Sequence, residues 1–199
     1  MIANSKSGKV TMVEWENSWN QKMRNLEVYR TIRDIQETGN RALYDACDVT
    51  NGKAVHKVLS ALNKEFGPVT GVVHGAGLEE SKLVADKTWE SFSKVVSVKI
   101  DGWRSFVDAL EDQLSHLRVI CTFTSIAGRF GNGGQVDYAA ANNILDAEMC
   151  RISHHPDAPR AVAIAWSGWR DVGMATRGSL ESVFEQAGIE TIPVDTGVE

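Results

Sequence analysis

Cysteine, proline and long apolar runs are all scarce in this sequence. Its 199 residues include three cysteines and four prolines. The cysteines (Cys47, Cys121 and Cys150) form no CxxC pair or other metal-ligand spacing, and so few are typical of a reducing compartment. The polar start MIANSKSGKV does not read as a signal peptide, and no apolar run is long enough to cross a bilayer. These absences favour a cytoplasmic location and no membrane partner.

The charge balance and overall composition further limit the class of protein that this sequence can encode. The net charge of −5 gives no reason to expect a nucleic-acid partner. There is no internal repeat and no Pro- or Ser-rich linker. With 43% hydrophobic residues, the chain can bury one sizeable core.

Helix and strand patterns alternate along the chain. Residues 13–38 repeat apolar positions every three or four residues, which predicts a helix that ends at Gly39. Further helices are predicted after a cap at Thr50, over residues 87–110 and over residues 137–153. Between them, the predicted strands are the apolar runs RALYDACDV, VTGVVHGAG, LRVICTFTS and AVAIAWSGW. This order predicts an α/β fold with a parallel sheet covered by helices on both faces.

Each predicted strand ends in small or polar residues. Ligands of open α/β sheets bind beyond the carboxyl ends of the strands. The residues at these four ends are Asp48; Gly75, Ala76 and Gly77; Thr124 and Ser125; and Ser167 and Gly168. Turns favour the same residue types, so a turn explains any single end. Four such ends at one edge indicate a binding site.

Two predicted helices carry polar residues of interest. Lys99 falls within the apolar stripe of the helix over 87–110, where a charge is costly unless it is paired or used. The alternative is that its ammonium reaches the surface along the side chain. In the stretch GQVDYAAANN, Tyr138 and Asn142 are four residues apart and therefore share a helix face.

Lys99, Ser125, Tyr138 and Asn142 together resemble the catalytic set of the short-chain dehydrogenase/reductase superfamily. More narrowly, they resemble the ketoreductase domains of polyketide synthases and polyunsaturated fatty acid synthases. Ordinary members have the lysine four residues after the tyrosine, whereas these ketoreductases have an asparagine there and the lysine earlier, as in VKIDG and YAAAN here. The resemblance extends through CDVT, VVHGAG, FTSIAGRFGNGGQ, YAAANNILDA and AWSGW.

The resemblance implies a Rossmann-type, doubly wound sheet and a definite reaction. NADPH would reduce a β-ketoacyl thioester on an acyl carrier protein to the β-hydroxyacyl thioester, and the other domains of a multidomain synthase would be partners. Tyr138 would donate the proton, with its pKa lowered by the Lys99 ammonium, while Ser125 would hydrogen-bond the ketone oxygen. Asn142 would belong to the surrounding hydrogen-bond network. The implied cofactor-binding residues are Asp48, Val49, Gly75, Ala76, Gly77, Ser167 and Gly168.

The glycine-rich segment GRFGNGGQ is predicted to shape the substrate side of the site. It lacks the lysine of a P-loop and the spacing of a dinucleotide fingerprint. Phe130 and Gln135 lie in it, and Phe130 stands eight residues before Tyr138, where ketoreductases of one stereochemical type often carry tryptophan. We therefore expect the L-hydroxy product, with a packed loop residue as the alternative reading of Phe130. The adjacent His154 and His155 do not share a helix face, so no metal site is expected.

The sequence also departs from the family pattern. We find no strand–GxGxxG–helix unit before Asp48, and the sequence stops where the family continues. We therefore expect a single partial ketoreductase domain over 1–199, truncated at both ends and lacking the first two strands. It would consist of a helical segment over about 1–39 and a catalytic subdomain over about 40–199. The alternative is a non-enzymatic fragment, or a degenerate reductase, that keeps the catalytic residues and binds no cofactor.

Overall fold

The computed structural model describes residues 11–156, 158–173 and 188–199. The chain divides into two compact units, Met1–Ala46 and Cys47–Glu199. The helix predicted over 13–38 is confirmed as α1 (Met12–Glu37), in the first unit. It begins at Thr11, whose hydroxyl and the Glu14 carboxylate cap each other's backbone N–H groups, and it ends before Gly39, which has a φ of 80°.

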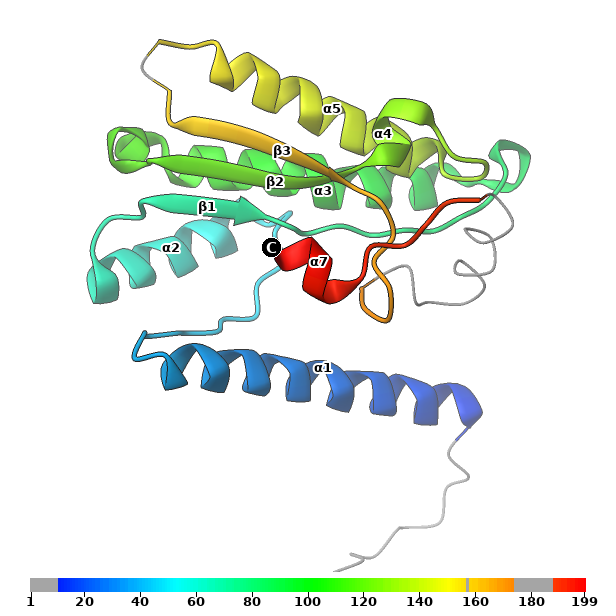
Figure 1. The fold of residues 1–199 in the computed structure, drawn as a ribbon, viewed down its shortest axis with the longest axis horizontal. Helices are drawn as coiled ribbons and strands as arrows, with labels where there is room; N and C mark the ends of the chain where they lie inside the picture. Colours follow the sequence, from blue (N-terminus) through cyan, green and yellow to red (C-terminus); the bar gives the residue numbers. More distant parts are fainter. Residues whose placement is uncertain (1–10, 157, 174–187) are drawn as a thin grey trace, which may run out of the picture. The chain divides into compact units, whose positions relative to one another are not determined.

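The second unit contains a parallel sheet of three strands in the order β1–β2–β3 (Figure 1). The strands are β1 (Gly71–His74), β2 (Val119–Ser125) and β3 (Arg160–Trp166). Helix α2 (Gly52–Phe66) precedes β1, α3 (Trp89–Ala109) leads to β2, and α4 (Ile126–Phe130) and α5 (Val136–Ser153) lead to β3. The shorter elements are η1 (Val84–Asp86), η2 (Glu111–His116) and α7 (Val194–Val198). The predicted α/β class with a parallel sheet is confirmed.

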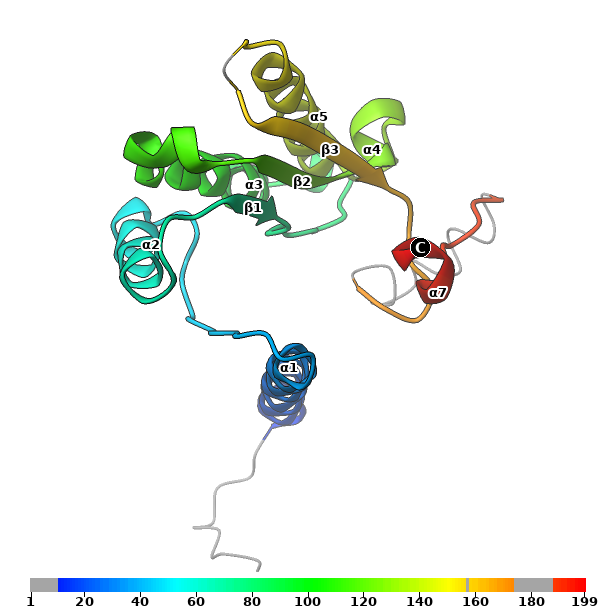
Figure 2. The ribbon, with the colours of Figure 1, turned by 60° about the vertical axis from the view of Figure 1, so that its left-hand side comes forward.

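The core of the second unit lies between one face of the sheet and the helices α3 and α5. Alternate residues of β1 and β2 point to that face, which is why Val72 and Ile120 are buried. Trp103 of α3 and Leu145 of α5 belong to the same buried cluster. The second view shows α3 and α5 together on this side of the strands (Figure 2).

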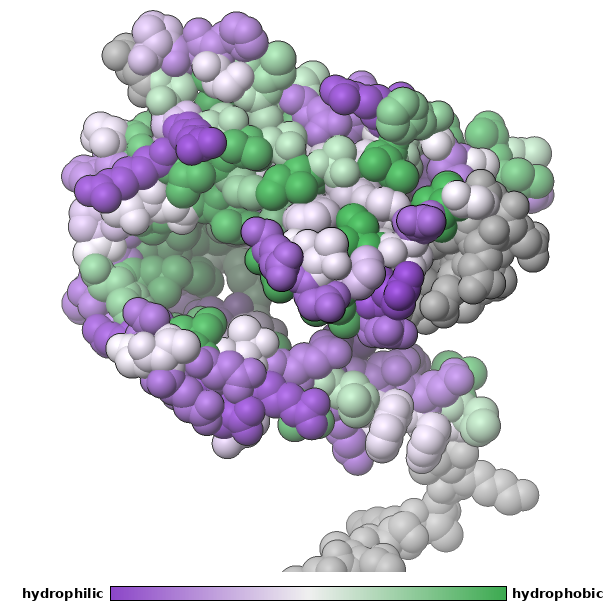
Figure 3. Space-filling view, viewed as in Figure 1, coloured by the Kyte–Doolittle hydropathy of each residue, from purple (hydrophilic) through white to green (hydrophobic). Residues whose placement is uncertain are grey.

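Helices on both faces of the sheet were expected; among the described residues of the second unit, α3 and α5 lie on one face, and strand residues of the other face are exposed. Val73, Val119 and Phe123, on the face opposite α3 and α5, are 63%, 40% and 38% exposed. Apolar residues gather over the strands in the space-filling view (Figure 3). The reason is topological: both crossovers step across the sheet in the same direction, and right-handed crossovers then place both helices on the same face.

The strand predicted in RALYDACDV is also wrong, because residues 41–48 form no regular structure. A strand needs a hydrogen-bonded neighbour, and β1 pairs with β2 alone among the described strands. The cap of the following helix is Asn51 rather than Thr50, because the Asn51 side chain accepts the N–H of Ala54 at 3.2 Å.

Candidate active site

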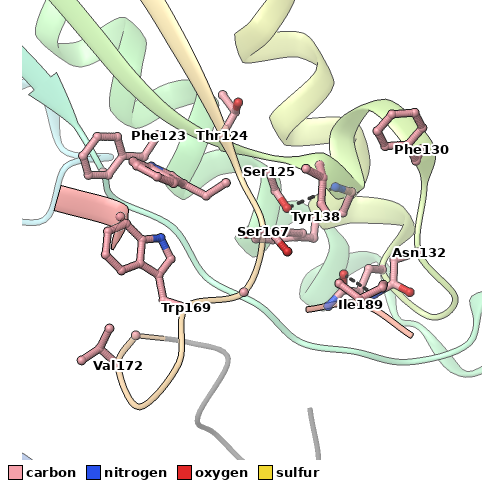
Figure 4. A pocket seen from close by; sticks show the side chains of 18 of the residues that line it. Phe123, Thr124, Ser125, Phe130, Asn132, Tyr138, Ser167, Trp169, Val172 and Ile189 are labelled. Atoms are coloured by element: carbon pink, nitrogen blue, oxygen red, sulfur yellow. Dashed lines mark hydrogen bonds between the residues drawn. The ribbon is translucent and has the colours of Figure 1, made fainter. Parts of the chain in front are cut away.

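A cavity of about 890 Å³ lies at the carboxyl ends of β2 and β3. Lys99 from α3, Ser125 from the end of β2 and Tyr138 from α5 all line it. In the close view, Ser125, Tyr138 and Ser167 occupy the middle, with Trp169 on one side and Phe130 on the other (Figure 4). The topology therefore brings three of the four predicted catalytic residues to one place.

Aromatic rings form one wall of this cavity. Phe123 and Trp166 meet edge to face with ring centroids 5.9 Å apart, and Trp166 and Trp169 do so at 4.9 Å. Helix α7 packs against Trp169 so closely that a Cβ on Gly197 would lie 2.5 Å from the indole. Sequence reasoning did not assign these rings to the site, although the motif AWSGW contains two of them. They make one side of the cavity apolar.

Lys99 is buried and 4% exposed. Its ammonium donates to the carbonyl oxygen of Phe123 at 2.7 Å, so the alternative in which it reaches the surface is wrong. Burial lowers the pKa of Lys99 to about 8, and the carboxylate of Asp146 acts in the opposite direction. A Cβ on Gly77 would lie 3.3 Å from Lys99 Cε, so this glycine makes room for the lysine side chain.

Tyr138 is held from both ends of its backbone, and its phenol is partly buried. Its carbonyl accepts a hydrogen bond at 2.8 Å from Asn142 Nδ2, and Asn142 itself is fully buried behind the cavity. Burial raises the pKa of Tyr138, while hydrogen bonding to Ser125 lowers it and the nearby charge of Glu79 raises it. The lowering expected from Lys99 is therefore not present in this structure, where burial has the larger effect.

Ser125 has two roles in the site. As the cap of α4, its Oγ accepts the N–H of Ala127 at 3.2 Å. The same side chain is the hydrogen-bonding group that lowers the pKa of Tyr138. The end of β2 therefore fixes the serine beside the tyrosine.

The predicted cofactor-binding residues fall into two groups. Gly75, Ser167 and Gly168 line the cavity, whereas Asp48, Val49, Ala76 and Gly77 do not. Asp48 is exposed, and its carboxylate accepts from the N–H and hydroxyl of Thr50 at 2.9 and 2.8 Å, which lowers the pKa of Asp48. Val49 packs against Gly102, where a Cβ would lie 2.9 Å from the valine. Both residues thus have structural explanations.

The predicted substrate-loop residues Phe130 and Gln135 both line the cavity. Phe130 is 80% exposed, so its alternative reading as a packed loop residue is wrong. Gln135 is buried, accepts from Asn132 Nδ2 at 2.9 Å and donates to Glu79 Oε1 at 3.1 Å. The loop is therefore anchored through Gln135, with Phe130 left free at the mouth.

Sequence reasoning missed a buried ion pair beside the site. Lys87 and Asp137 lie 2.6 Å apart, with side chains 3% and 1% exposed. The sequence pattern singles out Lys99 as the cation on a buried face, but Lys87 is a second one. Lys87 follows η1, where no helical periodicity marks a buried position. The one feature of the sequence that could have indicated this ion pair is the position of Asp137 next to Tyr138.

Of the adjacent histidines His154 and His155, the first makes a hydrogen bond within its own helix end. His154 Nδ1 donates to the carbonyl of Cys150 at 2.7 Å, which gives this carbonyl in the last turn of α5 a hydrogen-bond partner. Among residues 11–156, 158–173 and 188–199 there is no cluster of three metal-ligating side chains. In the same ranges, no helix has the length and apolar character needed to span a membrane.

The fold and the site define a Rossmann-like α/β domain with a serine, a tyrosine and a lysine in one cavity. Residues 8–171 match the KR domain family, and the chain belongs to that family. Among curated proteins, it is 29% identical over 175 residues to a polyunsaturated fatty acid synthase polypeptide of Thraustochytrium sp., covering 87% of this chain and 6% of that protein. It is 31% identical over 162 residues to mellein synthase of Phaeosphaeria nodorum, covering 80% of this chain and 9% of that protein.

Solved ketoreductases have the same fold. A ketoreductase domain from the bacillaene assembly line matches with a TM-score of 0.73 and 27% identity, covering 89% of this chain and 42% of that one. The ketoreductase from the first module of phoslactomycin biosynthesis in a Streptomyces species matches with a TM-score of 0.75 and 30% identity, covering 85% and 38%. The chain thus spans less than half the length of each of these two proteins.

Proposed function

We propose that this chain acts as the ketoreductase of a polyketide or polyunsaturated fatty acid synthase, reducing a β-ketoacyl thioester on an acyl carrier protein with NADPH. The observation that carries the proposal is that Lys99, Ser125 and Tyr138, from three different elements, line one cavity. Family membership and the relatives among multidomain synthases support it. The other synthase domains are the proposed partners, and the cytoplasm is the proposed location.

The cavity suits the nicotinamide end of the cofactor. Thr124 lines the cavity, and its buried Oγ1 has no hydrogen-bond partner among the described residues. Together with Ser167 and Gly168, it offers polar groups to the same cavity as the aromatic wall. We assign the nicotinamide end to these three residues. The described residues include no glycine-rich turn of the kind that holds a pyrophosphate.

The chain's own side chains provide the proton and orient the ketone. When bound, NADPH supplies the hydride. Tyr138 donates its phenolic proton to the ketone oxygen, and its raised pKa keeps the phenol protonated at neutral pH. Ser125 hydrogen-bonds the same oxygen and holds it in place.

Lys99 and the aromatic wall stabilise the charge that develops on the ketone oxygen during reduction. Below about pH 8 the Lys99 ammonium is protonated and stabilises the negative charge that develops on the ketone oxygen. The rings of Phe123, Trp166 and Trp169 make one side of the cavity apolar, which strengthens these electrostatic interactions.

Product analysis tests the proposal. The purified chain is incubated with a β-ketoacyl thioester, either carrier-bound or as the free pantetheine thioester, at increasing NADPH or NADH concentration. Mass spectrometry should detect a β-hydroxyacyl product that requires NADPH and forms faster on the carrier. Absence of product at every cofactor concentration would favour the non-enzymatic alternative.

A further inference from the structure

The buried ion pair beside Tyr138 lies outside the cavity and takes no direct part in the proposed chemistry. Asp137 is the second residue of α5, and Lys87 immediately precedes Thr88, the cap of α3. Lys87 Nζ contacts Asp137 Oδ2 at 2.6 Å and also donates to the carbonyl of Glu80 at 2.6 Å. The charge of Asp137 is therefore bound to a segment fifty residues earlier in the chain.

The second oxygen of Asp137 holds the backbone of Tyr138. Asp137 Oδ1 accepts the Tyr138 N–H at 2.9 Å. This N–H belongs to the first turn of α5, where backbone donors lack partners within the helix. The capping residue, Gln135, makes no side-chain hydrogen bond to the helix, so Asp137 supplies the missing acceptor. Asn142 holds the Tyr138 carbonyl, and the tyrosine backbone is thus fixed on both sides.

Neighbouring contacts join the same two segments. Gln135 Nε2 donates to Glu79 at 3.1 Å, and the N–H of Lys82 donates to the carbonyl of Gly134 at 2.9 Å. The Lys87–Asp137 pair is the charged and most deeply buried of these links. It determines where the first turn of α5 stands against residues 79–87.

We propose that Lys87 and Asp137 are positioning residues that place the Tyr138 phenol against Ser125, an inference that rests on the function proposed above. A carboxylate and an ammonium buried this deeply cost free energy, and an apolar pair of similar volume often holds two segments as well or better. An apolar pair, however, gives the Tyr138 N–H no acceptor. The need for a fixed acceptor oxygen explains why residue 137 is polar although it is buried.

Two double variants separate this role from simple packing. Lys87→Met with Asp137→Asn removes both charges and keeps an acceptor oxygen at residue 137. Lys87→Met with Asp137→Leu removes the charges and the acceptor at similar volume. Neither variant leaves an unpaired buried charge. We expect kcat of the Asn variant to exceed that of the Leu variant by about tenfold or more, with KM similar in both.

A second readout does not depend on turnover. The chain has three tyrosines, so with Tyr29→Phe and Tyr44→Phe an absorbance titration reports Tyr138 alone. Because hydrogen bonding to Ser125 lowers the pKa of Tyr138, its loss in the Leu variant should raise the titration midpoint by about half a pH unit or more above the Asn variant. The other groups that act on the phenol, Glu79 and Asn142, are the same in both variants.

The outcomes distinguish failure of the inference from failure of the proposed function. Equal midpoints in the two variants overturn the inference, and so does equal kcat in an active enzyme whose variants melt at the same temperature. A midpoint difference in a chain that reduces no ketone supports the placement of the phenol and refutes the proposed function alone. If the Leu variant does not fold, Lys87→Met with Asp137→Ala replaces it in the same comparison.

Discussion

Replacing Lys99 by methionine should stabilise the second unit at neutral pH. Burial lowers the pKa of Lys99 from 10.5 to about 8. The gap between these values corresponds to about 3 kcal/mol by which the fold disfavours the charged lysine. The variant also loses the hydrogen bond from the charged ammonium to the Phe123 carbonyl, which offsets about 2 kcal/mol. We therefore expect a net gain of about 1 kcal/mol.

The gain should depend on pH in a definite direction. Below about pH 8, Lys99 is protonated in both the folded and unfolded states, and the full cost of burying its charge is present. Between about 8 and 10.5, the folded state loses the proton while the unfolded state keeps it, so the wild type gains stability as pH rises. The advantage of the variant should shrink by about 1 kcal/mol between about pH 7 and pH 9.

Urea unfolding followed by tryptophan fluorescence measures this difference. Lys57→Met, at an exposed position of α2, is the matched control and should show no such pH-dependent gain. A Lys99→Met variant whose advantage stayed constant from about pH 7 to pH 9, or that was less stable than wild type at neutral pH, would contradict the reasoning.

Three further predictions concern the loop, the cofactor and the packing of α4. Phe130→Ala should lower the stereochemical purity of an L-configured β-hydroxyacyl product; chiral chromatography that finds a D product in the wild type, or unchanged purity in the variant, counts against a role for the ring. Calorimetric titration with NADPH should show weak binding, with a Kd above the micromolar range, because the described residues include no turn for the pyrophosphate; a micromolar Kd would mean that another element holds it. Gly128→Ala should destabilise the chain by about 1–3 kcal/mol in thermal unfolding, because its Cβ would lie 2.9 Å from Asn142 Cβ. Gly133→Ala, with nothing within 4 Å, should change stability little, and equal effects would remove the packing argument.

Most of the fold was predictable because its signals are local. Apolar runs identified β1, β2 and β3, and three- and four-residue periodicity identified α1, α3 and α5. RALYDACDV has the same local pattern but forms no strand, since pairing depends on a neighbouring strand rather than on the segment itself. The placement of the described helices α3 and α5 on one face of the sheet likewise follows from crossover direction, which composition does not encode.

The site was predictable where its residues stand in periodic elements or at strand ends. Lys99 stood out as a charge in an apolar stripe, and Ser125 as the end of a strand; both line the cavity. Lys87 could not be found in this way, because it lies outside the periodic elements and its burial comes from contacts with Glu80, in an irregular segment, and with Asp137, at the start of α5. The raised pKa of Tyr138 was also out of reach, since it depends on how deeply the phenol is buried.

Two residues that the sequence predicts to bind the cofactor also make contacts that stabilise the fold, and only the structure shows these contacts. Gly77 reads as part of a cofactor-binding strand end, yet it makes room for Lys99. Asp48 reads in the same way, yet its carboxylate holds Thr50 ahead of α2. These contacts give Gly77 and Asp48 a structural role, and their predicted part in cofactor binding stays a prediction.

Turnover of Tyr138→Phe tests the central claim most directly. The substitution removes the proposed proton donor and keeps the ring, so cofactor binding and stability should change little. With a β-ketoacyl thioester and NADPH, we predict that kcat falls by about a hundredfold or more relative to the wild-type chain. A variant that reduced the ketone within a few-fold of the wild-type rate would contradict the assignment of Tyr138 as the proton donor.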